Sequence, residues 1–268
     1  MLLGCFLIFS CSSKITPDKG QKSTDINEYI TVLKEYDKES NTTYYLTIIK
    51  HKDKNGKIIE LMTDFANKQE GETVRAFAIR KNTAVAINAS MGIRNLPPNT
   101  RQPSGIQIID GKIIQELATT SYTLGIKNHN ELVAYAPKVK AADILKDGAQ
   151  NALTGFLPLI ENYEPVSEDI LRVRNNSFDK HPRQVIAQFG NLDILILSCG
   201  GRGINGDGMT AKEMMRILKD LKVKFAFNLD GGGSVSTVIG DKLITPKIDD
   251  NGTSERLRPN FLYIQRNN

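Results

Sequence analysis

The sequence predicts an α+β fold that is rich in strands, with several β-hairpins, a mixed central sheet and one capped helix packed on it. Three observations lead to this class. From about residue 43 onward, short apolar runs alternate with Asn-Gly, Asp-Gly and Gly-Asn turns, a pattern typical of hairpins. One segment, 210–221, has clear helical periodicity. Apolar residues make up 40% of the 268 positions, which is enough for a core.

The expected elements follow one another with short connections. Each predicted hairpin consists of two apolar runs flanking a turn: 44–49 with 58–61, 106–109 with 113–114, 122–126 with 132–135, 185–189 with 192–197, and 235–239 with 243–244. Further strands are expected at 83–89, 223–229 and 261–264, and a short helix or loop at 144–148. Thr210 and Glu213 form a capping-box pattern that starts the helix.

The first residues predict export and lipid attachment. Residues 1–10 are apolar but too short to cross a bilayer, which takes about 20 residues, so they are typical of an export signal. Residues 8–13 resemble the lipobox of bacterial lipoproteins, with Cys11 as the lipidated residue. Polar residues 11–28 would form a flexible tether, and 29–268 a single domain. This arrangement would place the protein in the bacterial cell envelope, held to the membrane by its lipid.

Composition excludes several functional classes. The net charge is +5, from 35 basic and 30 acidic residues without a long basic run, which argues against nucleic-acid binding and is compatible with an anionic small-molecule substrate. The three cysteines and three histidines are scattered, so neither a metal knuckle nor a disulfide framework is predicted. P-loop, dinucleotide-binding and G-x-S-x-G signatures are absent from the sequence.

The most informative stretch is 228–234, where Asp230 follows an apolar strand and precedes three glycines and Ser234. Glycines allow a backbone to approach a ligand closely, and a strand end can present a carboxylate to a substrate. The same residues could also form a tight turn without further function.

Other polar motifs follow predicted strands or turns. Asn88 lies near the end of strand 83–89, and the long loop 91–104 contains Arg94 and Arg101, as binding loops and lids often do. The remaining candidates are His181-Pro182-Arg183, Arg202 among glycines 200, 201 and 203, and the segment 255–260 with Glu255, Arg256 and Asn260.

Together these segments resemble the phosphodiester glycosidase domain, the family of the N-acetylglucosamine-1-phosphodiester α-N-acetylglucosaminidases. The resemblance is strongest over 74–264, and 228–234 is its most diagnostic part. Two departures from the family pattern are visible. Gly200 or Gly201 stands where the family has Asp before Gly-Arg, and Ser90-Met91-Gly92 replaces the small and aromatic residues that usually continue the motif after Asn88. The resemblance implies hydrolysis of a sugar 1-phosphodiester, with release of the sugar from a phosphorylated carbohydrate or phosphoglycan.

Roles for individual residues follow from that implied reaction. Arginine matches the geometry of phosphate oxygens, and a phosphate leaving group needs less acid assistance than an alkoxide, so one carboxylate could suffice. The expected catalytic residues are Asp230, Arg202 and Glu255, the last a weaker candidate for a second carboxylate. The expected substrate-binding residues are Asn88, Arg183, Asn228, Gly231, Gly232, Ser234, Arg256 and Asn260.

Two alternatives remain open at this stage. The protein could be a non-catalytic lipoprotein of the cell envelope that binds a glycan or phosphoglycan. It could also cleave phosphoesters with a metal held by Asp230 and Asp207, although no cofactor is expected from the sequence.

Overall fold

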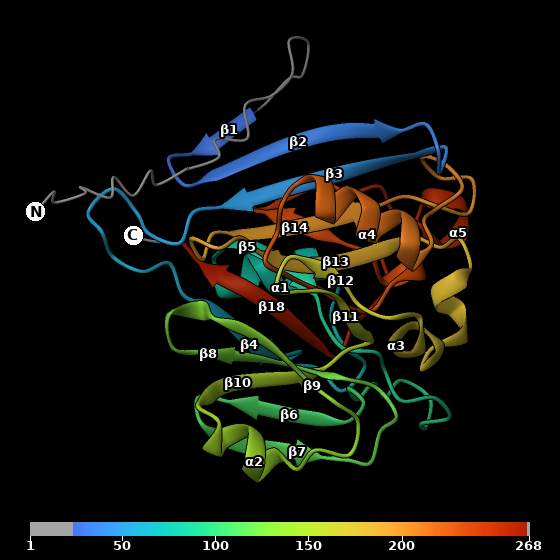
Figure 1. Cartoon of the computed structure of the whole chain (residues 1–268). Coiled ribbons are helices and arrows are strands. Elements are labelled where there is room, and N and C mark those ends of the chain that lie inside the picture. Colours follow the sequence, from blue (N-terminus) through green and yellow to red (C-terminus); the bar gives the residue numbers. More distant parts are fainter. Residues whose placement is uncertain (1–23, 267–268) are drawn as a thin grey trace, which may run out of the picture.

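The computed structural model describes residues 24–266 (Figure 1). The predicted export signal and the lipidation of Cys11 lie outside these residues. Residues 24–27, which the prediction assigned to the tether, form strand β1 and pair with β2, so the ordered domain begins before residue 29. No helix in the described range has the length and apolar character needed to cross a bilayer.

The α+β class is confirmed: three sheets and five helices make up the described chain. The largest sheet has eight strands, in the order β1 (Thr24–Asn27), β2 (Ile30–Asp37), β3 (Thr42–Ile49), β14 (Ile194–Cys199), β13 (Arg183–Gln188), β15 (Phe225–Asn228), β11 (Leu157–Glu161) and β12 (Glu164–Pro165).

Two five-stranded sheets complete the fold. The β5 sheet has the order β17 (Lys242–Leu243), β16 (Thr237–Ile239), β5 (Thr83–Asn88), β18 (Asn260–Gln265) and β4 (Leu61–Phe65). The β10 sheet has the order β7 (Lys112–Glu116), β6 (Ile106–Ile109), β10 (Ala149–Thr154), β8 (Thr123–Lys127) and β9 (Leu132–Tyr135). One apolar core joins all three sheets, through residues such as Ile186, Phe227, Leu262 and Leu153.

The helices lie on the outside of the sheets. They are α1 (Val74–Lys81), α2 (Ala141–Lys146), α3 (Glu168–Arg172), α4 (Ala211–Asp220) and the short α5 (Asp249–Gly252), with 3-10 turns at Asn128–Asn130, Asn175–Phe178 and Gly232–Ser234. In α4 the predicted capping box is present, because Thr210 Oγ1 accepts from the Glu213 amide and the Glu213 carboxylate accepts from the Thr210 amide. Its Met214 and Leu218 pack into a second core against the eight-stranded sheet.

Helix α1 was not predicted. Its apolar residues do not repeat at a clear helical spacing, yet Thr73 caps it and its Phe77 stacks on Phe261 of β18, with ring centroids 4.1 Å apart. This helix therefore depends on burial against the β5 sheet rather than on a pattern visible in the sequence.

Two details of the prediction are corrected. The central sheet is antiparallel and not mixed, since every paired strand in the described range runs antiparallel to its neighbours.

The second correction concerns the predicted hairpin of residues 44–49 with residues 58–61, which does not form. Its turn forms, with Asp53 accepting from Asn55 and Lys57, but β3 pairs with β2 and β14 while β4 pairs with β18. Long-range pairing therefore separated the two runs into different sheets. The other four hairpins are present.

Candidate active site

Several strand ends meet at one cavity. β5 ends at Asn88, β15 at Asn228 and β14 at Cys199, while β13 begins at Arg183 and β18 at Asn260. Strand pairing holds these ends together, because Arg183 lies opposite Cys199 and Phe261 lies opposite Asn88. The loops that leave these strand ends therefore converge, although they are far apart in the sequence.

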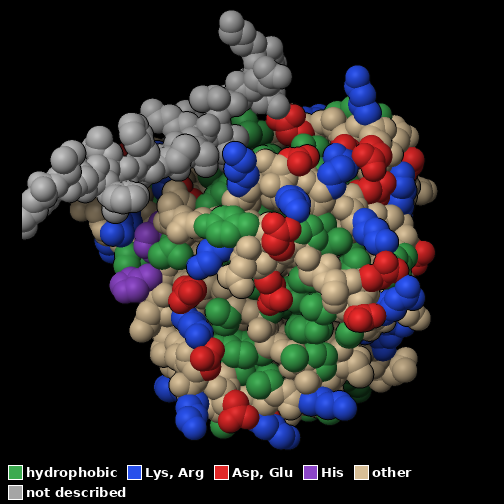
Figure 2. All heavy atoms as spheres, in the orientation of Figure 1, with side chains coloured by type: hydrophobic (Ala, Val, Ile, Leu, Met, Phe, Trp, Pro, Cys, Tyr) green, Lys and Arg blue, Asp and Glu red, His purple; other side chains and the backbone are tan. Residues whose placement is uncertain are grey.

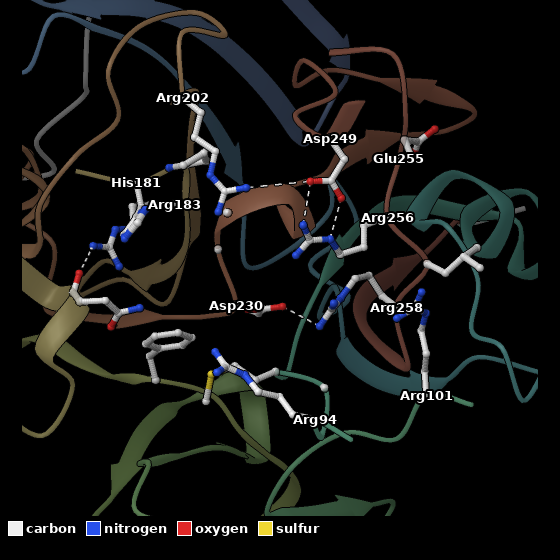
Figure 3. Close-up of a pocket in the computed structure, with 18 of the residues that line it drawn as sticks. Arg94, Arg101, His181, Arg183, Arg202, Asp230, Asp249, Glu255, Arg256 and Arg258 are labelled. Carbon is white, nitrogen blue, oxygen red and sulfur yellow. Dashed lines mark hydrogen bonds and ion pairs between the residues drawn. The ribbon is translucent and has the colours of Figure 1, made fainter. Parts of the chain in front are cut away.

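The cavity has a volume of about 670 Å³ and an unusual charge composition. Its lining includes six arginines and three carboxylates: Arg94, Arg101, Arg183, Arg202, Arg256, Arg258, Asp230, Asp249 and Glu255 (Figure 3). On the outer face drawn in Figure 2, by contrast, acidic and basic side chains are interspersed and no basic stripe is present. The excess of positive charge in the cavity suits an anionic ligand.

Asp230 lies in the cavity with a buried counter-charge. Its carboxylate contacts Arg258 Nη2 at 2.5 Å, and the two side chains are 15% and 6% exposed. Burial lowers the pKa of Arg258, against the opposing effect of the Asp230 charge. The sequence pointed to Asp230, whereas its partner Arg258 was not selected.

Glycine is required at the positions after Asp230 for different structural reasons. Gly232 has φ +62, a conformation that favours glycine, and its amide donates to the Pro182 carbonyl at 2.8 Å. A Cβ on Gly233 would overlap the Asp249 carboxylate and the Arg256 guanidinium. Gly231 and Gly232 line the cavity. These glycines therefore let the Asp230 loop pack directly against the charged side chains beside it.

Asn88 fixes both ends of that loop. It is fully buried, its Nδ2 donates to the Asp230 carbonyl at 2.7 Å, and its Oδ1 accepts from the Ser236 amide at 3.1 Å. Asn88 is not part of the cavity lining, so the structure gives it a positioning role rather than direct exposure to a ligand.

Asn260 belongs to a buried network behind Arg258. Its Nδ2 donates to Ser90 Oγ and to Gln107 Oε1, and its Oδ1 accepts from the Ser90 amide, at 2.9–3.0 Å. The Ser90 carbonyl accepts from Arg258 Nη2 at 2.9 Å. This chain of contacts orients the guanidinium that pairs with Asp230.

A second carboxylate, Asp249, organises two more arginines. It accepts two hydrogen bonds of 2.7 Å from Arg256 and lies 4.0 Å from Arg202 Nη1. Arg202 is half-exposed and has φ +59. The sequence did not indicate Asp249, because it lies in a turn of ordinary composition and only the folded chain brings it to the glycine loop.

Arg183 and His181 form the opposite wall. Arg183 is 2% exposed, and its donors bond the carbonyls of Met209, Asn176 and Asp179 at 2.6–2.9 Å. Burial lowers the pKa of Arg183 to about 10. Burial, with the charges of Arg183 and Arg202, also lowers the pKa of His181, which favours a neutral imidazole beside the cavity.

Glu255, expected as the weaker candidate for a second carboxylate, lines the cavity. Figure 3 shows its carboxylate directed away from Asp230. It is 6% exposed, one oxygen lies 3.6 Å from Arg75 Nε, and the other has no hydrogen-bond partner among the described residues. Asp249 is therefore the carboxylate that lies with Asp230 and the arginines.

Asn228 and Ser234 are buried beneath the loop rather than in the cavity lining. Each has a side-chain oxygen without a hydrogen-bond partner in the described part of the chain. Cys199, the one cysteine in the described range, is buried, and burial raises the pKa of its thiol to about 12. Within residues 24–266, no group of three His, Cys, Asp or Glu side chains is arranged to hold a metal ion.

Residues 81–265 match the model of the phosphodiester glycosidase family. The SPβ prophage-derived uncharacterized protein YomE of Bacillus subtilis is 30% identical over 194 residues, which are 70% of this chain. The alignment spans 29% of the length of that relative.

Solved structures with low sequence identity share the fold. The zebrafish N-acetylglucosamine-1-phosphodiester α-N-acetylglucosaminidase catalytic domain, auto-inhibited by its pro-peptide, aligns with TM-score 0.68 and 18% identity over 92% of this chain and 84% of its own. A hypothetical protein from Synechocystis aligns with TM-score 0.72 and 15% identity, over 93% and 64% of the two chains. A putative exported protein from Burkholderia pseudomallei gives 0.64 and 14%, over 84% and 74%.

Proposed function

Because the chain belongs to the phosphodiester glycosidase family, we propose that it hydrolyses a sugar 1-phosphodiester, with Asp230 as the catalytic carboxylate and cavity arginines as the phosphate site. The observation that carries this proposal is the position of Asp230 in a cavity lined by six arginines. The substrate would be a phosphorylated carbohydrate or a phosphoglycan.

The arginines differ in how they could contact the phosphate. Arg202 is half-exposed, and its one ion pair among the described residues is the 4.0 Å contact with Asp249, so it can turn toward a phosphate oxygen. The Arg256 guanidinium donates two hydrogen bonds to Asp249, and it adds positive charge on the side of the cavity where Arg202 lies. Arg183 is buried, and its Nε and Nη2 already donate to backbone carbonyls, so its expected contribution is mainly electrostatic and structural. These positive charges would stabilise the phosphate as its leaving oxygen gains charge.

The proposed chemistry uses one carboxylate. Asp230 takes a proton from a water molecule as the water oxygen bonds to the anomeric carbon and the bond from that carbon to the phosphate oxygen breaks. The products are the free sugar and a phosphate monoester, whose low basicity removes the need for a strong acid at the leaving oxygen. Neutral His181, at the cavity wall, is placed to move a proton after the bond breaks.

Turnover of a sugar 1-phosphodiester with a chromogenic leaving group tests the proposed function. We expect release of free sugar, and incorporation of ¹⁸O from labelled water into the sugar rather than the phosphate. We also expect activity to survive exhaustive chelation, since no metal-binding cluster is present in the described residues. Tight binding of these diesters without any turnover would instead favour a glycan-binding protein, and loss of activity on chelation would favour metal-dependent cleavage.

We further propose that the protein works in the bacterial cell envelope, attached by a lipid on Cys11. The apolar residues 1–10 and the lipobox-like sequence at 8–13 support this, and one structural relative is described as a putative exported protein. Metabolic labelling with an alkyne fatty acid should label the wild-type chain and not Cys11→Ala. Cys5→Ala is the matched control and should keep the label, whereas equal labelling of both variants and the wild type would contradict lipidation at Cys11.

A further inference from the structure

Neither Arg94, which lines the cavity, nor Arg174, which lies over the lining residue Phe156, has a carboxylate partner among the described residues. Arg94 is exposed and lines the cavity, and Figure 3 shows Asp230 between it and the group formed by Arg202, Asp249 and Arg256. The pKa of Arg174, which follows α3, is lowered by burial and by the positive charge of Arg94.

Phe156 lies under Arg174. Its ring is 7% exposed and lines the cavity, and the Arg174 guanidinium carbon is 5.6 Å from the ring centroid. Arg174 Nε is buried without an acceptor. A buried donor of this kind costs free energy unless a ligand satisfies it. An aromatic ring beside a guanidinium group can contact the carbon face of a sugar while the arginine binds an anionic group.

The charge balance of the cavity also indicates more than one anion. Each of its three carboxylates already faces an arginine, through the pairs Asp230–Arg258, Asp249–Arg256 and Glu255–Arg75. Four lining arginines remain beyond these pairs: Arg94, Arg101, Arg183 and Arg202. A single phosphodiester carries one negative charge, so it would leave most of this positive charge uncompensated.

We propose that Arg94 and Arg174 form a second anion site, which binds a phosphate of the substrate other than the one whose bond is broken. The substrate is then a phosphoglycan chain with at least two phosphate groups. This inference rests on the proposed function only in taking the cavity as the substrate site. Arg94 and Arg174 set the preference for a chain over a single diester, and Arg202 and Asp230 act at the scissile group.

The test measures binding rather than turnover, so it does not depend on catalysis. The full chain carrying Asp230→Asn is titrated calorimetrically with N-acetylglucosamine 1-(methyl phosphate), which has one phosphodiester, and with the dimer of the same sugar phosphate unit, which has two. We expect the two-phosphate ligand to bind at least about tenfold more tightly, as charge-assisted contacts to a second phosphate provide. This preference should shrink as the salt concentration rises.

Arg94→Gln and Arg174→Gln, alone and together, should reduce the preference to less than about threefold while changing one-phosphate binding little. Arg172→Gln is the matched control, because Arg172 is exposed and paired with Glu168. Thermal unfolding checks the fold, and exposed Arg94 gives a variant that should fold even if Arg174→Gln does not. Equal affinity of the two ligands, binding of neither, or an unchanged preference in Arg94→Gln would overturn the second site.

Discussion

Asp230→Asn is expected to lower kcat for sugar 1-phosphodiester hydrolysis by about 10²–10⁴-fold, the usual contribution of a positioned general base. The amide keeps an oxygen that can accept from Arg258, which the carboxylate contacts at 2.5 Å, so the loop should keep its place. KM should change much less than kcat, because the arginines that surround the phosphate are untouched. Steady-state kinetics with a chromogenic diester measures both quantities.

Asp241→Asn provides the control for this variant. Asp241 is exposed in the turn between β16 and β17 and does not line the cavity. The Asp241→Asn variant should therefore have the same activity as the wild type. If Asp230→Asn kept more than a tenth of wild-type kcat while remaining folded, Asp230 would not be the catalytic carboxylate, and Asp249 would be the next group to replace.

Arg258→Gln is expected to lower both stability and activity. The Arg258 side chain is 6% exposed and that of Asp230 15% exposed, and removing one partner of a buried ion pair typically costs about 3–5 kcal/mol. The variant also loses the hydrogen bond to the Ser90 carbonyl. Urea denaturation should therefore show a lower free energy of unfolding, and kcat should fall because the Asp230 carboxylate loses its orientation.

A double-mutant cycle separates the pair from the rest of the loop. Asp230→Asn combined with Arg258→Gln should destabilise the protein by less than the sum of the two single changes, because the double variant leaves no buried charge unpaired. Arg75→Gln is a suitable control, since its ion pair with Glu255 is long and Arg75 itself is half-exposed. Strictly additive free energies would mean that Asp230 and Arg258 do not interact in solution.

Local patterns in the sequence were sufficient for much of the fold. Turn residues between apolar runs identified four hairpins correctly, and the Thr210–Glu213 capping box identified helix α4. Such features depend on residues a few positions apart. The failures involve contacts between distant segments. The partner of β3 was misassigned, and strands β2 and β10 and helix α1 were not predicted because burial against other elements forms them.

The site could be predicted in outline but not in its contacts. Asp230, Arg202 and Arg256 were identified from the sequence, and all three line the cavity. Arg258 was passed over although it lies two residues from Arg256, and Asp249 gave no signal. Asn88 and Asn260, which the sequence suggested as substrate-binding residues, are both buried and bonded to loops that support the site.

By itself, the sequence determined that Asp230 follows a strand and stands before three glycines, and that arginines recur near other strand ends. Only the tertiary structure decided which charges meet. It paired Asp230 with Arg258 and Asp249 with Arg256 and directed Glu255 away from Asp230. Among the described residues, it left Arg94 and Arg174 without carboxylate partners. The physical reason is that turn and strand preferences act locally, whereas the compensation of a buried charge depends on side chains that long-range strand pairing brings together.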